Sequence, residues 1–362
     1  MRRVSTGDLI PGMIAAEDVY TYANQLVLTK GIVLTDNTIT KLSFYSILSV
    51  MVEDESVAMP PSAPVFPQEE TFNQRVQASP EFRRFKKEFE NEADSLESTL
   101  NDVVKKNAPI DTDYLLSGIL GLVSLQKEGS FPIFNMLSNM RMYDDVTYVH
   151  SINVGLICNV FARWLHMSED EIRLATLCGL LHDIGKMLVP ESIIKKPAKL
   201  TDSEYQQIKE HPISGYKILR SHDIDPHICN AALMHHERCD GSGYPIGLPG
   251  DRIDRYARIV AISDVYDATT SARLYRGPLC PFTVIALFEH EGFAKYDPQC
   301  IMTFLENIVN TYLLNTVYLS NGTTAKIVFI NREHLSQPTL ETEDGRFIDL
   351  SKETNLKIEA II

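Results

Sequence analysis

The chain of 362 residues has no long apolar run and no compact set of cysteines. A membrane-spanning helix needs about 18 or more consecutive apolar residues, and no stretch approaches that length. The N-terminal segment MRRVSTGDLIPGM lacks the apolar core of a secretory signal peptide. The cysteines are scattered without a CxxC pair, which favours reduced thiols over disulfides. These absences predict a cytoplasmic protein that does not associate with membranes.

Basic charge is also scarce, because 34 Lys and Arg residues face 48 Asp and Glu residues, a formal net charge of −14. Such a surface disfavours nonspecific binding to DNA or anionic lipid. An anionic substrate would therefore need a local cationic pocket, and bound metal ions are one way to form it. The sequence also lacks an alternation of strands with crossover helices, so a doubly wound sheet is not expected.

The first 109 residues divide into three segments. Short apolar runs separated by turn residues predict a small β-rich module over residues 1–57. Residues 58–68 contain four prolines and predict an extended linker. Residues 69–109 have mixed charge and a helix start at Ser79-Pro80, which indicates an exposed connecting helix.

The rest of the chain divides into a helical and a β-rich part. Apolar residues at spacings of three and four predict α-helices over residues 110–313. Residues 314–362 return to short strands, with Asn321-Gly322 as a hairpin turn. We therefore expect a mainly α protein with a small β-rich module at each end.

Histidine and aspartate side chains occur where the helical pattern predicts burial. His150 lies on the apolar face of an expected helix over residues 148–166. His182 and Asp183 directly follow an apolar run, and a bare buried carboxylate costs several kcal/mol or more. Taken singly, each has an alternative: a hydrogen-bonded core histidine for His150, and an ion pair with Lys186 for Asp183.

Asp264 also ends an apolar run, and Asp267 follows one helical turn later on the same side. A buried ion pair with Arg273 or Arg276 is the alternative here. One metal site would explain several such burials together. The residues concerned are His150, His182, Asp183, His211, His235, His236 and Asp264.

The kinds of side chain in this set indicate the kind of metal. Imidazole and carboxylate without thiolate favour iron, manganese, nickel or zinc as divalent ions, and disfavour a structural zinc site. Seven ligands are too many for one ion with an open position. Two ions that share a carboxylate fit the number better.

The motifs that contain these residues resemble, in order and spacing, those of the HD-GYP phosphodiesterases, a branch of the HD metal-dependent phosphohydrolases. The motifs are His150, HDIGK at 182–186, EHP at 210–212, HHERCDGSGYP at 235–245 and ISDVYDATTSARLYR at 262–276. The resemblance covers roughly residues 130–312. It implies that residues 110–313 form an HD-type α-helical catalytic domain. Such domains hydrolyse cyclic di-GMP first to pGpG and often on to GMP.

The resemblance also implies roles for individual residues. One ion would be held by His150, His182, Asp183 and Asp264, and the second by Asp183, His211, His235 and His236. Iron or manganese is favoured, with nickel or zinc as alternatives. Lys186 would contact the scissile phosphate, and Asp267 would orient a ligand or the metal-bound water.

Three further residues are expected to contact the substrate. Tyr244 would border it, although a loop aromatic that packs on the helices is an equally common role. Arg273 and Arg276 resemble nucleotide-contacting positions of the family, because a guanidinium can bind a phosphate or a guanine edge with two hydrogen bonds. Surface arginines, or arginines paired with aspartate, are the alternative.

The chain departs from the family pattern at three positions. Some members bind a third ion through a glutamate one turn before the first histidine, where this chain has Val146, with Asp144 and Asp145 nearby but off that face. We therefore expect two ions. Cys239 and Leu274 stand where tryptophan and proline are frequent, and neither replaces a ligand.

The expected reaction is two-metal phosphodiester hydrolysis, in which a bridging hydroxide attacks phosphorus in line with the departing ribose 3′ oxygen. No residue is an obvious general acid. A different nucleotide substrate is one alternative: cyclic GMP-AMP, (p)ppGpp or a dNTP. Another alternative is a low-activity scaffold that binds a GGDEF-type diguanylate cyclase through the loop DGSGYP at 240–245. The charged helix over residues 79–107 could support a homodimer.

Overall fold

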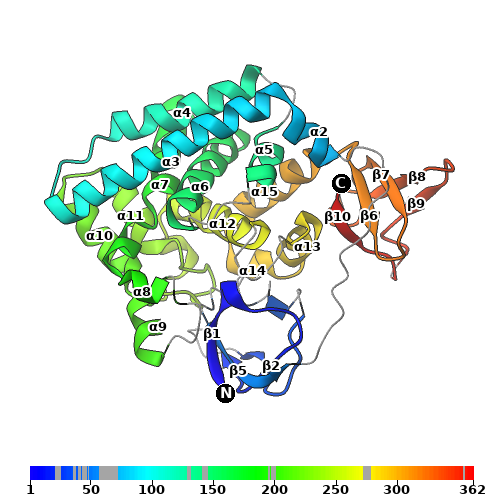
Figure 1. Ribbon diagram of the computed structural model, residues 1–362, viewed down its shortest axis with the longest axis horizontal. Coiled ribbons are helices and arrows are strands. Elements are labelled where there is room, and N and C mark those ends of the chain that lie inside the picture. The colour runs from blue at the N-terminus through cyan, green and yellow to red at the C-terminus, as the bar shows by residue number, and fades with distance from the viewer. Residues whose placement is uncertain are drawn as a thin grey trace.

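In the computed structural model the chain runs from a small β-rich module through a large helical region to a second sheet (Figure 1). The description covers the chain except residues 21–25, 36–37, 40–41, 43–46, 48, 57–71, 129–131, 141–145, 195, 197–200, 272–278 and 354. The proline-rich segment 58–68 and both Arg273 and Arg276 therefore lie outside the described residues. The expected mainly α fold is confirmed.

The N-terminal module is built from short antiparallel strands. They are β1 (Arg2–Ser5), β2 (Met13–Ala15), β3 (Val19–Tyr20), β4 (Leu26–Leu28) and β5 (Ser49–Ser56). β5 lies between β1 and β2 in one sheet, and β3 pairs with β4. The apolar side chains of this module form a hydrophobic cluster of their own, separate from the core of the helical region.

The helical region surrounds one continuous core. Its longer helices are α3 (Pro80–Lys106), α4 (Thr112–Glu128), α6 (Val146–Trp164), α7 (Glu169–Leu181), α10 (His211–Ser221), α11 (Pro226–Met234), α12 (Arg255–Thr270) and α15 (Pro298–Asn310). Shorter ones are α2 (Phe72–Ala78), α5 (Ile133–Met140), η2 (Ile184–Leu188), α8 (Glu191–Ile194), α9 (Asp202–Lys209), η3 (Gly250–Arg252), α13 (Pro281–Leu287), the π-helix η4 (Phe288–Gly292) and α14 (Phe293–Lys295).

Helix α3 begins where the sequence predicts, since the Ser79 hydroxyl accepts a hydrogen bond from the Phe82 amide. It is not, however, exposed on all sides as its mixed charge predicts. Its buried side chains are Phe82, Phe85, Phe89, Leu96, Leu100 and Val103. These lie on one face at helical spacing and join the core, while α4 runs alongside (Figure 1). A homodimer through this helix would therefore have to use its polar face.

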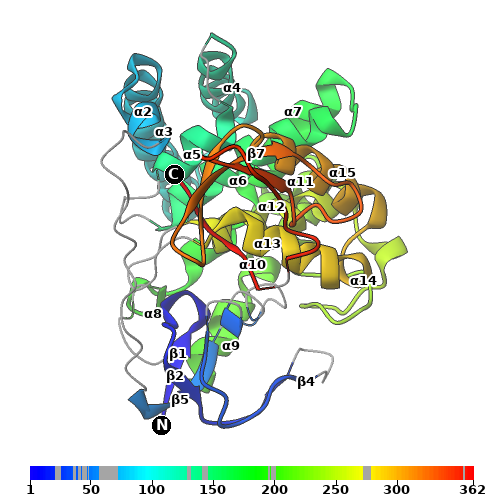
Figure 2. The ribbon, with the colours of Figure 1, turned by 90° about the vertical axis from the view of Figure 1, so that its right-hand side faces the viewer.

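The C-terminal segment forms a five-stranded antiparallel sheet in the order β10-β6-β7-β8-β9. Its strands are β6 (Thr316–Leu319), β7 (Thr324–Phe329), β8 (Thr339–Thr342), β9 (Phe347–Asp349) and β10 (Ile358–Ile361). The hairpin expected at Asn321-Gly322 is confirmed, because β6 and β7 pair across it and Gly322 has a φ of 84°. One face of the sheet packs onto the helical core. In Figure 2 the sheet lies in front of the helices, and the N-terminal module lies below them.

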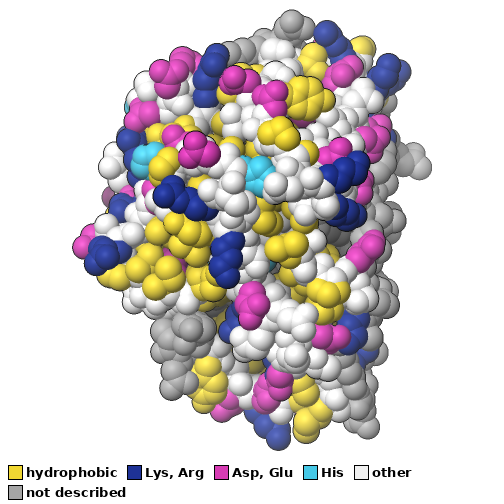
Figure 3. Space-filling view, turned by 90° about the vertical axis from the view of Figure 1, so that its left-hand side faces the viewer, with side chains coloured by type: hydrophobic (Ala, Val, Ile, Leu, Met, Phe, Trp, Pro, Cys, Tyr) yellow, Lys and Arg dark blue, Asp and Glu magenta, His cyan; other side chains and the backbone are white. Residues whose placement is uncertain are grey.

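The surface mixes charges of both signs with apolar side chains, as the face in Figure 3 shows. Among the residues that the structure describes, no helix is both long and apolar enough to span a bilayer. All six cysteines lie in the described part of the chain and are free thiols, as the scattered spacing predicts.

Candidate metal centre

The ends of several helices bring the candidate ligands into one place. His150 lies in the first turns of α6, and Asp264 lies in the second half of α12. His182 caps the C-terminus of α7, and Asp183 follows it directly. The remaining ligands come from the start of α10 (His211) and from the two residues after α11 (His235 and His236).

The glycine of the HDIGK motif allows two of these segments to meet. A Cβ atom at Gly185 would lie 2.0 Å from the carbonyl oxygen of His211 and 2.5 Å from the amide nitrogen of Gly215. Only glycine therefore permits the backbone of η2 to touch the start of α10. This close approach places His211 next to Asp183.

The carboxylate of Asp183 stands between two groups of imidazoles. Its Oδ1 atom lies 3.2 Å from Nε2 of His211 and 3.7 Å from Nε2 of His235. Its Oδ2 atom lies 3.3 Å from Nε2 of His182 and 3.7 Å from Nε2 of His150. Burial raises the pKa of this carboxyl, but the interactions with His182, Lys186 and His211 outweigh burial and hold the pKa well below its usual range. The two oxygens thus face two different sets of nitrogen ligands.

Asp264 faces the same two sets from the opposite helix. Its Oδ1 atom lies 3.0 Å from Nε2 of His150 and 3.9 Å from Nε2 of His182, and its Oδ2 atom lies 3.9 Å from Nδ1 of His236. The residues form overlapping clusters whose ligand atoms lie within 4.8 Å of one another. The clusters are His211, His235 and His236; His150, His182 and Asp264; and His182, Asp183 and His235.

Asp267 lies behind His150. Its Oδ2 atom is 2.7 Å from Nδ1 of His150, and its Oδ1 atom accepts hydrogen bonds from Asn153 and Ser271. Burial lowers the pKa of His150, but the hydrogen bonds to Asp264 and Asp267 outweigh burial and raise it to about 9. In this arrangement the Asp267 carboxylate accepts a hydrogen bond from Nδ1–H of His150, and Nε2 of His150 faces Asp264.

Main-chain carbonyls orient three further imidazoles. Nδ1 of His182 lies 2.7 Å from the carbonyl oxygen of Gly179, and Nδ1 of His211 lies 2.7 Å from that of Ile208. Nδ1 of His235 lies 3.0 Å from the carbonyl oxygen one turn earlier, at residue 232. Because a carbonyl can only accept, each Nδ1 carries the proton and each Nε2 presents a lone pair to the centre.

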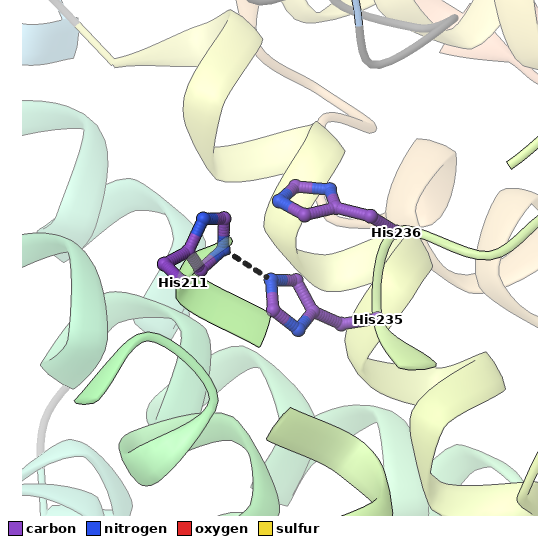
Figure 4. Close-up of side chains that lie close together, drawn as sticks. All are labelled: His211, His235 and His236. Carbon is purple, nitrogen blue, oxygen red and sulfur yellow. Dashed lines mark hydrogen bonds between the residues drawn. The ribbon is translucent and has the colours of Figure 1, made fainter. Parts of the chain in front are cut away.

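The lone pairs of His211 and His235 point at each other, with their Nε2 atoms 3.2 Å apart (Figure 4). Burial lowers the pKa of His211, His235 and His236 below the usual value of an imidazole, so all three are neutral at pH 7. Two facing lone pairs repel each other unless a cation or a proton lies near both. Both ring nitrogens of His236, Nε2 of His182 and Oδ1 of Asp183 are also buried without a hydrogen-bond partner among the described residues. These orphaned donors and acceptors fit bound metal ions.

The predicted substrate residues are placed differently from one another. Lys186 is partly exposed, and its ammonium group donates to Asp183. Tyr244 is only 3% exposed and stacks on His236, with ring centroids 4.6 Å apart and an interplanar angle of 24°. Its position matches the packing role that the sequence leaves open. Arg273 and Arg276 lie outside the described residues.

Sequence reasoning missed the residues that hold the segment after His236. The buried carboxylate of Glu237 accepts hydrogen bonds from the amides of Ile246, Gly247 and Leu248. The guanidinium of Arg238 donates to carbonyl oxygens within its own turn. Both residues stand in the motif HHERCDGSGYP, directly after the paired histidines. The sequence does not show whether such charged residues support the loop or take part in catalysis.

Comparison with known proteins identifies the helical region. Residues 136–300 match the family described as HD domain. This part of the chain, just under half of its length, is therefore similar to an HD domain. The expected resemblance to HD-type phosphodiesterases is confirmed, because the chain matches this family model and is also 37–40% identical to several curated cyclic di-GMP phosphodiesterases over part of its length.

Three relatives show the range of similarity. Cyclic di-GMP phosphodiesterase PA4108 of Pseudomonas aeruginosa is 39% identical over 174 residues, 48% of this chain and 42% of that protein. The 3′3′-cGAMP-specific phosphodiesterase 1 of Vibrio cholerae is 39% identical over 170 residues, 47% of this chain and 39% of that protein. The response regulator RpfG of Xanthomonas campestris pv. campestris, a cyclic di-GMP phosphodiesterase, is 40% identical over 151 residues, 41% of this chain and 40% of that protein. The chain thus spans about two fifths of the length of each of these relatives.

Proposed function

We propose that the chain is a metal-dependent phosphodiesterase that hydrolyses cyclic di-GMP to pGpG, with GMP as the alternative final product. The observation that carries the proposal is the position of Asp183, whose two carboxylate oxygens face different pairs of histidines. A carboxylate in that position suits a site for two divalent ions. The names of the cyclic di-GMP phosphodiesterases among the relatives support the substrate.

The candidate ligands would divide into two sets, one for each ion. His150, His182, Asp183 and Asp264 would hold one ion, and Asp183, His211, His235 and His236 the other. Divalent ions in such a site lower the pKa of bound water and neutralise charge that develops on the phosphate. Iron or manganese suits the ligand set of imidazole and carboxylate.

Charged and aromatic groups next to the ligands complete the proposal. The ammonium group of Lys186 lies beside Asp183, where it would add positive charge at the phosphoryl oxygens. Asp267 would keep the proton on Nδ1 of His150, so that Nε2 stays available to an ion. Tyr244 would limit the site on the side of His236, and Arg273 and Arg276 are proposed to bind the nucleotide.

A preference for 3′3′-cyclic GMP-AMP is the second candidate function, because a relative named for that specificity is as similar as the first cyclic di-GMP enzyme. The pattern of ligands does not separate the two substrates. The cytoplasmic location and the interaction with a diguanylate cyclase stay predictions from the sequence.

The test is hydrolysis by protein purified without oxygen and loaded with Mn²⁺ or Fe²⁺. Cyclic di-GMP, 3′3′-cyclic GMP-AMP and ppGpp are assayed, and the products are separated by chromatography. We expect kcat/KM to be highest for cyclic di-GMP, and expect no turnover by the His182→Ala, Asp183→Ala double variant. His334→Ala, at an exposed histidine far along the chain, is the matched control. Preference for cyclic GMP-AMP would select the second candidate, and turnover of none would refute both.

A further inference from the structure

Lys295 is a buried lysine at the end of α14, with 4% of its surface exposed. It is distant in sequence from every predicted site residue. A buried ammonium group is costly unless an anion and hydrogen-bond acceptors surround it. The groups that surround the Lys295 ammonium therefore indicate its structural role.

Those partners lie in the segment that follows the paired histidines, residues 237–245, here called the GYP loop. The Lys295 ammonium group donates to a carboxylate oxygen of Asp240 and, at 3.0 Å, to the hydroxyl of Ser242. Its main-chain carbonyl accepts a hydrogen bond of 2.8 Å from the amide of Cys239. Asp240 also binds the Ser242 amide and hydroxyl, at 3.0 and 2.6 Å. One residue thus holds the GYP loop by both its side chain and its main chain.

The next residue, Tyr296, extends this contact. Its ring lies under the guanidinium carbon of Arg238, 4.9 Å from the ring centroid. Arg238 is 1% exposed and donates to the carbonyl oxygens of His235 and Glu237, at 3.2 and 2.8 Å. Residues 295–296 therefore support the turn that carries the paired histidines.

The GYP loop then folds back on His236. A Cβ atom at Gly243 would lie 2.5 Å from the carbonyl oxygen of His236, so only glycine allows this contact. The amide of Tyr244 donates to that same oxygen at 3.2 Å, and the Tyr244 ring covers the imidazole. His236 has no hydrogen bond at either ring nitrogen within the described part of the chain. Its orientation therefore depends on how the loop is held.

We propose that Lys295 is a positioning residue: through Asp240 and Ser242 it fixes the GYP loop so that Tyr244 holds the His236 imidazole toward the metal centre. The effect on catalysis rests on the proposed function, whereas the effect on the loop does not. Lys295 touches none of the candidate ligands and acts through the loop.

Hydrogen exchange of the backbone amides tests the effect on the loop without any substrate. Lys295→Met keeps most of the side-chain length and removes the donor, and Asp240→Ala removes the acceptor at a site that is partly exposed. In both variants we expect amides of residues 239–244 to exchange about 10-fold faster or more, with α6 unchanged. Lys196→Met, which removes another paired lysine, is the control. Unchanged exchange in the GYP loop would overturn the proposal.

Kinetics test the effect on catalysis with the same variants. We expect each single substitution to lower kcat/KM per Mn²⁺-loaded chain by about 10-fold, and the double variant to lose no more than that, because the two residues act as one unit. Losses that multiply to about 100-fold would overturn the proposal, since the residues would then act independently. A lower Tm with unchanged kcat/KM would overturn it too, because the role would be purely structural. If the unmodified protein hydrolyses no cyclic dinucleotide, the proposed function is wrong. Hydrogen exchange alone then tests whether Lys295 holds the GYP loop.

Discussion

The side chains that face the metal centre are oriented by groups that are not ligands. Main-chain carbonyls at the ends of α7 and α9 hold the Nδ1 protons of His182 and His211, while a carboxylate does so for His150. A main-chain carbonyl is neutral and does not take up a proton near neutral pH, so it orients the imidazole without adding negative charge. Asp267, in contrast, raises the basicity of His150 as well as orienting it. Among these orienting groups, Asp267 is therefore the one most sensitive to substitution.

The substitution Asp267→Asn should weaken metal binding by about 10- to 100-fold. The asparagine amide would turn a donor toward His150, or toward Asn153 and Ser271, all of which donate to the carboxylate now. Titration of the metal-free protein with Mn²⁺, followed by electron paramagnetic resonance, measures the change. Asp251→Asn, at an exposed position in η3, should leave the affinity unchanged. Equal affinity in the two variants would contradict this role for Asp267.

A second prediction at this scale concerns Glu237, which is 2% exposed and accepts from three successive amides. In Glu237→Gln one of the two oxygens becomes a donor that faces another donor. We expect a loss of about 1–3 kcal/mol in the free energy of unfolding, the cost of an unsatisfied buried group. Urea denaturation measures it. An unchanged midpoint and slope would mean that the amides of residues 246–248 do not depend on the carboxylate.

At the scale of the elements, periodicity and turn residues predicted the features that depend on residues close together in the sequence. The helix that carries His150, the cap at Ser79 and the hairpin at Asn321-Gly322 depend on neighbouring residues, and each was predicted. The buried face of α3 was missed because its many charges hid six apolar residues at helical spacing. Lys295 could not be predicted, because its partner Asp240 is separated from it by 55 positions. Contacts of that kind depend on the tertiary fold.

The packing of α3 against α4 makes a pH-dependent prediction. The Glu92 carboxylate lies against Gly118, where a Cβ atom would approach it to 2.1 Å, and burial raises its pKa to about 7. A carboxyl whose pKa is higher when folded binds its proton more tightly in the folded state, so stability falls as pH rises from about 4.5 to above 7. Glu92→Gln should therefore raise Tm at pH 8 and have little effect at pH 4. Glu88→Gln, an exposed neighbour, is the control, and an equal effect at both pH values would exclude a role for charge.

At the scale of the whole molecule, the candidate ligands join five separate segments of the helical region. They come from α6, the end of α7, the start of α10, the end of α11 and α12. In the absence of a cation, imidazoles and carboxylates are concentrated in one buried place, and the facing Nε2 atoms of the neutral His211 and His235 repel each other. Bound ions would therefore stabilise the packing of these helices as well as supply chemistry.

Removal of metal should lower Tm, and the difference should grow with pH. An ion that binds only the folded state at about 100 times its Kd contributes about 2.7 kcal/mol. The pKa of His150 is raised to about 9, so this residue stabilises the metal-free fold at pH 6 and loses that contribution as pH rises toward 9. Protons also compete with the ion for His150, so the affinity for metal increases over the same range. These are two descriptions of one linkage, which increases the difference in Tm between Mn²⁺-loaded and EDTA-treated protein from pH 6 to pH 8. Differential scanning calorimetry measures it, and the His182→Ala, Asp183→Ala variant should show no difference. A gap that shrinks with rising pH would mean that His150 does not bind the ion.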